Sequence, residues 1–596
     1  MWTLDFETEA IEGNTTRFPP KPVGLAIRDP YWVTAYITDW EQMRLCLQKV
    51  WSQPLLFHNA KFDIAVAMEW FELPYPPNVL NVHDTQFLIF LHEPHAPSLS
   101  LKPSAERILG LPPEEQNKLM DWIIRNVPGA TKKSWGAFIC KAPKELVAPY
   151  AIGDVERTHK LFEYLMPIIK DKGMVEAYIR EQQLLPILMA AEKRGLRVDI
   201  KALEYAIDLM GQAIEETDKR LFSLLNSTPF NLSSSAELAQ ALDKAGIVKQ
   251  WVLTPTGARS TAKDALRRCV ANSEVLQLLL YRGGMETCLT TFGEPWLAQA
   301  QREGGRLHPN WNQVRQEGYG SASKGTRTGR LSCDHPNLTN PPNEMIAEAP
   351  KGLPAIPKMR RFLLPEEGHK WIKRDFSSQE IRILAHYEDG ALMEAYRANP
   401  ELDPHQMAKD LIASITGMDL PRKDVKITAF ATIYGAGASG LSVQLECDYA
   451  RAKQVREAYL SAIPGIRTLG DALRNRGRNG LALKTWGGRR YLPEPPKLIK
   501  GVMRSFEYKL LNYLIQGSAA DQTKQAIIDW DVCREPSWAF LAALHDEVNI
   551  SVPEDEALSA MTYLKEVMNR DRFDVPMLSE GFIGDNFGEL NALESE

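Results

Sequence analysis

Hydrophobic and polar residues alternate over short runs near the amino terminus and follow longer, helical periods further along the chain. Up to about residue 175, short apolar runs are interspersed with helical segments, which is the pattern of an α/β domain. From about 176 to 300 the period is mostly helical, with long amphipathic stretches at 181–194 and 202–225. The predicted strands are Trp2–Phe6, Val23–Arg28, Trp32–Ile37 and Leu55–His58.

The pattern changes twice in the second half of the chain. Residues 304–358 are polar and rich in glycine and proline, and their cations indicate loops that contact a ligand. A second α/β region begins near residue 361, with helices over 404–459 and a hairpin at 484–491. The cations of the polar section are Arg315, Lys324, Arg327 and Arg330.

One predicted helix, residues 422–435, carries two cations and two aromatic residues at every fourth position. This spacing puts Arg422, Lys426, Phe430 and Tyr434 in one stripe. Cations at the amino end can hold phosphates, and aromatic rings one and two turns on can pack against a base, which suits a nucleoside triphosphate. The alternative is an amphipathic helix with Phe and Tyr in the core and solvated Arg and Lys. The stripe alone does not decide between them.

Composition narrows the class of protein only a little. A chain of 596 residues with 44% hydrophobic content predicts three to five packed units. A net charge of −6 argues against a nucleic-acid coat protein but permits a local basic groove. Seven scattered cysteines without a C-x-x-C pair favour reduced thiols. No membrane span or signal peptide is recognisable, so we expect a soluble cytoplasmic protein that makes no membrane contact. We also expect it to be a monomer.

Carboxylates form a first candidate site near the amino terminus. Asp5 and Glu7 share one face of a predicted strand, where they repel each other unless a cation bridges them. Asp63 follows the next strand, and Tyr150 lies one helical turn before Asp154. Four such acids could hold two divalent ions ~4 Å apart, with Tyr150 orienting the attacking water. Each piece alone also arises by chance as a solvated face.

In their joint order these pieces resemble the three motifs of proofreading 3′→5′ exonucleases. The resemblance implies that Asp5, Glu7, Asp63 and Asp154 are metal ligands and that Tyr150 is catalytic. Asp84 matches a further acid of such domains, and we interpret it as structural.

A second group of carboxylates lies toward the carboxy terminus. Asp546 and Glu547 stand between apolar runs and are expected at the tip of a β-hairpin, although a lone acid of this kind is more often in a surface turn or at a helix N-cap. Asp375 ends an earlier strand, and it could meet Asp546 across adjacent strands to hold two Mg²⁺. One ion would activate a primer 3′-hydroxyl and the other would stabilise departing pyrophosphate.

Together with the stripe, these residues resemble family A DNA polymerases, the bacterial DNA polymerase I type, over nearly the whole chain. Several motifs of that family occur in the same order, which makes coincidence implausible. The matching segments are 326–340, 375–382, 422–435, 512–521 and 545–547.

The resemblance implies a role for each candidate residue. Asp375 and Asp546 bind the metal ions, Glu547 supports them, and Lys426 protonates pyrophosphate. Glu380, packed against Tyr434, is the steric gate against a ribose 2′-hydroxyl. The residues expected at the nucleotide are His405, Arg422, Lys426, Phe430, Tyr434 and Glu380. Those expected at DNA are Arg330, Asn337, Asn512, Gln516 and His545.

Some positions depart from the family pattern. Ala429 stands where Asn is frequent, Thr339 where Gln is common, and Tyr508 where Arg is common, which bears on minor-groove and template contacts. The exonuclease motifs begin at residue 5, so we expect no 5′-nuclease domain, a compact form typical of phage replicative polymerases.

The predicted fold is α/β and multidomain: a ribonuclease H-like exonuclease domain followed by a right-hand polymerase domain. The exonuclease domain spans 1–175, and a mainly helical thumb spans 176–305. The palm comprises 306–400 and 492–596, with the fingers at 401–491.

The expected activity is template-directed DNA synthesis with 3′→5′ proofreading. Its cofactor would be Mg²⁺, two ions per active site, with Mn²⁺ as a substitute, and its partners would be primer-template DNA and dNTPs. A helicase, a single-strand-binding protein or a processivity factor could be a further partner, but no segment of the sequence identifies one. Two rival interpretations are a nuclease whose second half only binds DNA, and a scaffold with decayed sites. The complete sets of acids and cations argue against both.

Overall fold

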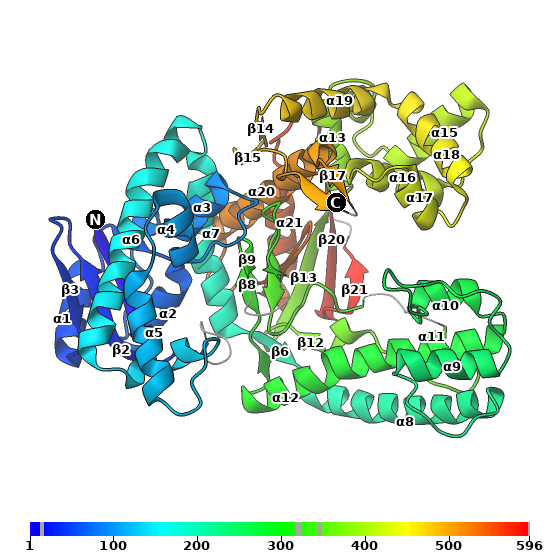
Figure 1. The fold of residues 1–596 in the computed structure, drawn as a ribbon. Helices are drawn as coiled ribbons and strands as arrows, with labels where there is room; N and C mark the ends of the chain where they lie inside the picture. The colour runs from blue at the N-terminus through cyan, green and yellow to red at the C-terminus, as the bar shows by residue number, and fades with distance from the viewer. Residues whose placement is uncertain (12–16, 318–322, 343–347, 500, 594–596) are drawn as a thin grey trace.

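The amino-terminal part of the computed structural model is built on a mixed five-stranded sheet (Figure 1). The structure describes residues 1–11, 17–317, 323–342, 348–499 and 501–593. The sheet has the order β3-β2-β1-β4-β5, with β1 antiparallel to β2 and parallel to β4. All four predicted strands are present, and β5 is an addition. The strands are β1 (Trp2–Thr8), β2 (Pro22–Arg28), β3 (Thr34–Ile37), β4 (Leu55–Phe57) and β5 (Val82–Asp84).

A long helix, α6 (Lys144–Asp171), packs on this sheet and contacts β1, β2, β3 and β4. Because Leu4 and Phe6 are buried on one side of β1, the alternating Asp5 and Glu7 project toward the other. The other helices here are α1 (Trp40–Val50), α2 (Ala60–Trp70), α3 (Thr85–His92), α4 (Leu101–Leu109), α5 (Glu114–Asn126) and the 3₁₀ segments η1 (Val79–Asn81) and η2 (Trp135–Lys141).

The second large sheet is antiparallel and lies at the centre of the molecule (Figure 1). Its middle strand is β13, flanked by β19 and β20. Strands β18 and β19 form the predicted hairpin, whose turn residue His545 has a φ of 60°. The strands are β13 (His369–Phe376), β18 (Ala539–Leu544), β19 (Glu547–Pro553), β20 (Ser579–Asn586) and β21 (Glu589–Ala592). The helices packed nearby are α7 (Val175–Arg194), α13 (Gln379–Glu388), α20 (Leu510–Cys533) and α21 (Ala557–Met568).

Two helical groups extend to the right of the central sheet in Figure 1, one toward the top and one toward the bottom of the view. The lower group begins at α8, because α7 packs against α20 and β18. It comprises α8 (Ile200–Leu224), α9 (Ser235–Lys244), α10 (Lys263–Cys269), α11 (Ser273–Thr287), the π-helix η3 (Cys288–Gly293) and α12 (Glu294–Arg302). The upper group comprises α14 (Ala391–Ala398), α15 (Pro404–Thr416), α16 (Arg422–Ile433), α17 (Ala438–Gln444), α18 (Tyr449–Ala462) and α19 (Pro464–Arg478).

Short strands and turns connect these parts. The polar section that we expected to be loops contains several two- and three-residue strands, and the side chain of Lys324 lies outside the described part. The hairpin expected at 484–491 is formed by β14 and β15. The short elements are β6 (Leu196–Val198), β7 (Arg306–Leu307), β8 (Asn310–Asn312), β9 (Gln316–Glu317), β10 (Ser323–Lys324), β11 (Ser332–Asp334), η4 (Met359–Phe362), β12 (Leu363–Leu364), β14 (Leu483–Lys484), β15 (Arg490–Tyr491), β16 (Lys497–Ile499), β17 (Val502–Arg504), η5 (Glu507–Lys509) and η6 (Glu554–Glu556).

A buried charged cluster joins three of these segments. Glu181 of α7 forms ion pairs with Arg489 of the β14–β15 hairpin and with Lys524 of α20. Arg489 also bonds Asp521 of α20 at 2.9 Å. Removing one member would leave a buried charge unpaired, so the cluster fixes how these segments meet.

Two whole-chain expectations can be compared with the structure. All seven cysteines are free thiols. Over the described ranges, no helix combines the length and apolar character that crossing a membrane requires.

Candidate active sites

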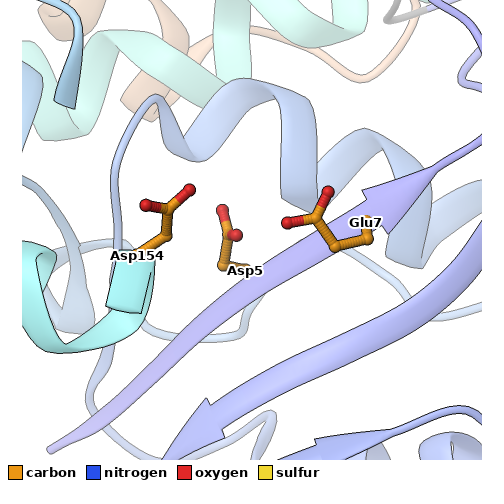
Figure 2. Close-up of side chains that lie close together, drawn as sticks. All are labelled: Asp5, Glu7 and Asp154. Carbon is orange, nitrogen blue, oxygen red and sulfur yellow. The ribbon is translucent and has the colours of Figure 1, made fainter. Parts of the chain in front are cut away.

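Three carboxylates meet between the amino-terminal sheet and α6 (Figure 2). Asp5 and Glu7 come from β1 and Asp154 comes from α6, and their ligand atoms lie within 4.8 Å of one another. Asp5 and Glu7 lie close together because they are two residues apart and so share one face of β1, and α6 crosses that face. Oxygen donors at this spacing are what Mg²⁺ or Mn²⁺ takes from proteins, so the residues fit the predicted metal ions.

Asp63, the fourth predicted ligand, lies beside this group but is not a member of it. Its Oδ1 accepts a hydrogen bond from the Phe6 backbone N–H at 2.9 Å. Burial, and then the charge of Asp5, raise the pKa of Asp63 well above its ordinary value. Its role as a ligand stays a prediction.

Asp84 has a different environment, in agreement with our structural interpretation. It caps α3 by accepting the Gln86 N–H at 2.7 Å. The N–H groups of Asn59 and Ala60 donate to the same carboxylate at 3.0 and 2.8 Å. Three backbone donors thus bind this carboxylate, which ties it to the start of two helices.

The electrostatics of the triad also favour a cation. Burial raises the pKa of Asp5 to about 7, the charge of Asp154 adds to this, and Lys102 opposes it. Burial and the charges of Asp5 and Asp154 raise the pKa of Glu7 well above its ordinary value. Closely spaced buried carboxylates are costly to ionise together, and a divalent ion removes that cost.

Sequence reasoning missed Lys102, a residue in the first turn of α4. Its ammonium forms an ion pair with Asp154 and lies 4.0 Å from the centroid of the Tyr150 ring. Tyr150 itself is buried on α6, one turn before Asp154. Lys102 is 52 residues from its acidic partner, so no local sequence signal could have found this contact.

The second candidate site lies where β13 ends beside the β18–β19 hairpin. Asp375 is paired with Glu547 in the strand register, and the Phe376 N–H donates to the Asp546 carbonyl at 3.2 Å. The end of β13 and the hairpin turn that carries Asp546 are therefore neighbours, and a shared metal site of Asp375 and Asp546 stays a prediction. Asp375 Oδ1 is buried without a hydrogen-bond partner, which fits a site for a cation. Burial and the charges of Asp546 and Glu547 raise the pKa of Asp375 to about 7.

Glu547 differs from the two aspartates because cations already hold it. Arg360 lies 3.5 Å and Lys373 lies 3.4 Å from its carboxylate oxygens. Lys373 also lies 3.9 Å from Asp375. This environment suits the supporting role predicted for Glu547, and sequence reasoning missed both cations.

Helix α16 resolves the alternatives for the cation and aromatic stripe. Arg422 and Lys426 are exposed, Phe430 is partly exposed, and Tyr434 just beyond the helix is 43% exposed. The stripe is therefore a surface that a ligand can reach, and the core interpretation is wrong. The buried face is formed instead by Val425, Thr428, Ala429, Ala431, Thr432 and Ile433.

Ala429 is explained by this orientation. It is 1% exposed and lies four residues from both Val425 and Ile433 on the buried face. Its small side chain packs against the core beneath the helix, away from the stripe, so it cannot contact DNA directly.

Glu380 on α13 links the stripe to the carboxylates. The Tyr434 hydroxyl donates to Glu380 at 3.4 Å, which matches the predicted packing, and Arg330 forms an ion pair with Glu380. Burial raises the pKa of Asp546, and the charge of Arg330 opposes this rise. Gln516 interacts with the Tyr434 side chain.

The cations of the stripe lie beside the start of α15. Arg422 donates to Asp403 at 2.6 Å, and Asp403 caps α15. The His405 ring lies 5.9 Å from the Phe430 ring. Arg422 and Lys426 thus lie at one end of the stripe, and Phe430 and Tyr434 lie at the other.

The remaining predicted DNA residues occupy separate positions. Asn337 is exposed and accepts the Thr339 N–H at 2.9 Å, whereas Asn512 lies on α20 with a buried, unpartnered Oδ1. His545 is exposed at the hairpin turn. Tyr508 packs against Gly435, which has a φ of 76° and no room for a side chain. The DNA contacts of these residues stay predictions.

The raised pKa values predict how metal ions and pH act on stability. Asp5 and Asp375 have a pKa of about 7 in the folded chain, above their value in the unfolded chain. At a pH between the unfolded and the folded pKa, folding therefore takes up protons. Metal-free protein should therefore lose stability as the pH rises from about 4 to about 7. Mg²⁺ binds the ionised carboxylates, so it should raise the melting temperature more at the higher pH. Thermal melts with EDTA or Mg²⁺ test this, and an equal Mg²⁺ effect at both pH values would contradict it.

Comparison with known proteins adds independent evidence. Residues 200–589 match the model of DNA polymerase family A. The thermostable DNA polymerase I of Thermus filiformis is 30% identical over 438 residues, which are 72% of this chain and 50% of that relative. The DNA polymerase DpoZ of Vibrio phage phiVC8 is 27% identical, and the match covers 100% of this chain and 96% of that relative. The chain thus spans half the length of the Thermus relative and nearly all of the phage relative.

A solved structure has the same fold. The POL domain of Pol1 from M. smegmatis, in complex with DNA primer-template and dNTP, aligns with a TM-score of 0.78 and 23% identity. The alignment covers 98% of this chain and 95% of that domain, so it includes both large sheets and both helical groups.

Proposed function

Because the chain belongs to DNA polymerase family A, we propose that it copies a DNA template from dNTPs and proofreads the product with a 3′→5′ exonuclease. The observation that supports the synthetic activity is that Asp375, at the end of β13, lies beside the β18–β19 turn that carries Asp546, and that Asp375 Oδ1 is buried without a hydrogen-bond partner. Two metal ions bound there would activate the primer 3′-hydroxyl and stabilise the departing pyrophosphate.

The residues around these aspartates fit the needs of such a reaction. Glu547 is held by Arg360 and Lys373 and lies beside Asp375 as a third carboxylate. Arg422 and Lys426 are exposed cations that can bind the triphosphate, and the Lys426 ammonium can give a proton to the leaving pyrophosphate.

Selection of deoxyribonucleotides is assigned to Glu380 and Tyr434. With the sugar bound beside them, their contact at 3.4 Å, reinforced by Arg330, would leave no room for a ribose 2′-hydroxyl. Phe430 and Tyr434 then flank the sugar and the nascent base pair. Arg330, Gln516 and His545 would contact the primer terminus in the minor groove, where correct pairs offer similar acceptors.

Proofreading is assigned to the amino-terminal domain. Asp5, Glu7 and Asp154 have the donors and spacing for divalent ions, and Asp63 lies against them. The order and direction of strands β1–β5 support a ribonuclease H-like domain. The central sheet would be the palm, the upper helical group the fingers and the lower helical group the thumb. The whole would be a replicative enzyme like those of phages.

Two rival functions are less compatible with these sites. A nuclease whose second half only binds DNA has no use for the partly buried Asp375 and Asp546 pair, because phosphate binding needs cations alone. A decayed scaffold would have lost some of these acids. Neither rival predicts an exposed cation and aromatic stripe beside the pair.

Extension of a labelled primer on a DNA template tests the proposal directly. We expect stepwise addition of dNTPs that requires Mg²⁺ or Mn²⁺ and stops when EDTA is added. Folded protein that digests single strands but never extends a primer would support the nuclease interpretation. Folded protein with neither activity would support the scaffold.

Discrimination against dideoxynucleotides is predicted from Phe430, which the family resemblance places at the nucleotide sugar. Wild-type protein should prefer dNTPs over dideoxynucleotides, and Phe430→Tyr should reduce that preference by at least about tenfold, a change of ~1.4 kcal/mol in relative transition-state binding. Competition between the two substrates in single-nucleotide extension measures the ratio. Equal incorporation by wild type, with no effect of Phe430→Tyr, would contradict this placement of Phe430.

A further inference from the structure

Lys102 brings a positive charge into the amino-terminal carboxylate site. Its side chain is 13% exposed, and its ammonium pairs with Asp154 Oδ2. The same ammonium lies 4.0 Å from the centroid of the Tyr150 ring. One side chain from α4 therefore contacts both residues that α6 contributes to the proposed exonuclease site.

Packing alone does not require this cation. Helix α4 is held against α6 by apolar contacts, in which Ala105 and the flanking Leu101 and Ile108 pack with Leu161 and Leu165. Asp154 also has a second cation, because Arg157 lies 3.7 Å from its Oδ1. Placing a lysine among carboxylates thus needs a reason other than attachment of α4.

We propose that Lys102 competes with metal ions in the exonuclease site and binds a phosphate of the DNA there, an inference that rests on the proofreading function proposed above. While no divalent ion is bound, its ammonium neutralises Asp154 and competes with metal ions for that carboxylate. When Asp154 ligates a metal ion, the ammonium is released and binds a phosphate oxygen of the DNA strand beside Tyr150.

The chemistry of lysine suits both positions. The ammonium is a compact charge with three donors on a flexible four-carbon stem, so it can turn from a carboxylate to a phosphate oxygen within the same site. Carboxylate and phosphate oxygens are alternative acceptors for the same charge-assisted hydrogen bond. The Lys102 side chain is largely buried and lies over the Tyr150 ring, which keeps its ammonium inside the site.

Metal binding by the full chain gives a first test that needs no activity. The probe is Mn²⁺, and its binding is measured by isothermal titration calorimetry. Asp375→Asn and Asp546→Asn are introduced first, so that the other carboxylate site does not bind Mn²⁺. In this background Lys102→Met should raise Mn²⁺ affinity about three- to tenfold, because the competing charge is gone. Unchanged or weaker Mn²⁺ binding would overturn the competition.

Lys141→Met is the matched control for this titration. Its ammonium also lies over an aromatic ring, 5.2 Å from the Phe138 centroid, but Lys141 is exposed on η2 and belongs to no carboxylate group in the described structure. Its removal should leave Mn²⁺ affinity unchanged. Equal tightening in both variants would indicate a general charge effect and would also overturn the proposal.

Digestion of a single-stranded oligonucleotide at saturating Mn²⁺ tests the second position. Lys102→Met should raise KM and lower kcat/KM at least about tenfold, while Lys102→Arg, which keeps a cation, should recover most of the loss. A purely structural lysine predicts a lowered melting temperature without tighter Mn²⁺ binding. Normal KM in Lys102→Met, or no recovery with arginine, would refute the phosphate contact.

Failure of the proposed proofreading would look different. If wild-type protein does not digest single strands, the exonuclease assignment falls and the phosphate contact falls with it. The Mn²⁺ titration would still decide whether Lys102 competes with metal ions for Asp154.

Discussion

Asp546→Asn is expected to reduce primer extension about a thousandfold or more, a loss of ~4 kcal/mol in transition-state stabilisation. Asp546 stands at the turn between β18 and β19, and its backbone carbonyl is fixed by the Phe376 N–H next to Asp375. The asparagine amide keeps the size of the side chain but removes the negative charge that would bind a metal ion beside Asp375. Steady-state single-nucleotide extension with Mg²⁺ measures the loss.

Asp555→Asn is the matched control for this substitution. Asp555 is exposed on η6, just beyond β19, so the same change of charge falls on the same segment away from the carboxylate pair. It should extend primers like wild type. The exonuclease activity of Asp546→Asn should persist, because Asp5 and Asp375 belong to different sheets. Extension by Asp546→Asn above about a tenth of the wild-type rate would contradict a metal-binding role.

The parts of the fold that could be predicted are those set by local periodicity. Alternation in Val548, Ile550 and Val552 defined β19, and the turn before it had to carry Asp546. The four amino-terminal strands followed from short apolar runs in the same way. Such patterns depend on which face of one element is buried, and each element reports that by itself.

Periodicity left the orientation of α16 open because both of its faces carry apolar residues. Phe430 and Tyr434 could equally have been core residues until the small residues, such as Ala429, were seen to pack inward. The deciding fact is tertiary: the buried face lies against α15, α18 and α20. Helix amphipathicity is a weak guide when the exposed stripe has to bind an apolar ring.

The cations of both sites were unpredictable for a related reason. Lys102 meets Asp154, and Arg360 meets Glu547, across long separations in the sequence. A lysine or arginine on a helix or turn is ordinarily solvated, so its residue type carries no signal until the chain folds. Carboxylates, in contrast, were recognisable because pairs of them recur at strand and helix spacing.

Asp5→Ala combined with Glu7→Ala is expected to lower 3′→5′ digestion of single strands by at least about a hundredfold while leaving extension nearly unchanged. The two substitutions remove two of the three carboxylates whose ligand atoms lie within 4.8 Å of one another, so too few ligands remain to hold two metal ions. Digestion and extension are measured on the same preparation. The control is Glu9→Ala, an exposed acid just beyond β1, which should retain both activities.

Stability separates loss of the metal site from loss of the fold in this double variant. Asp5 and Glu7 have raised pKa values because their charges are buried together, so removing them relieves repulsion in metal-free protein above about pH 7. The variant should therefore melt no lower than wild type in EDTA, and it should lose the part of the Mg²⁺ stabilisation that arises at this site. A lower melting temperature with loss of both activities would instead mean that the acids support the fold. Loss of both activities without a change in melting would refute independent active sites.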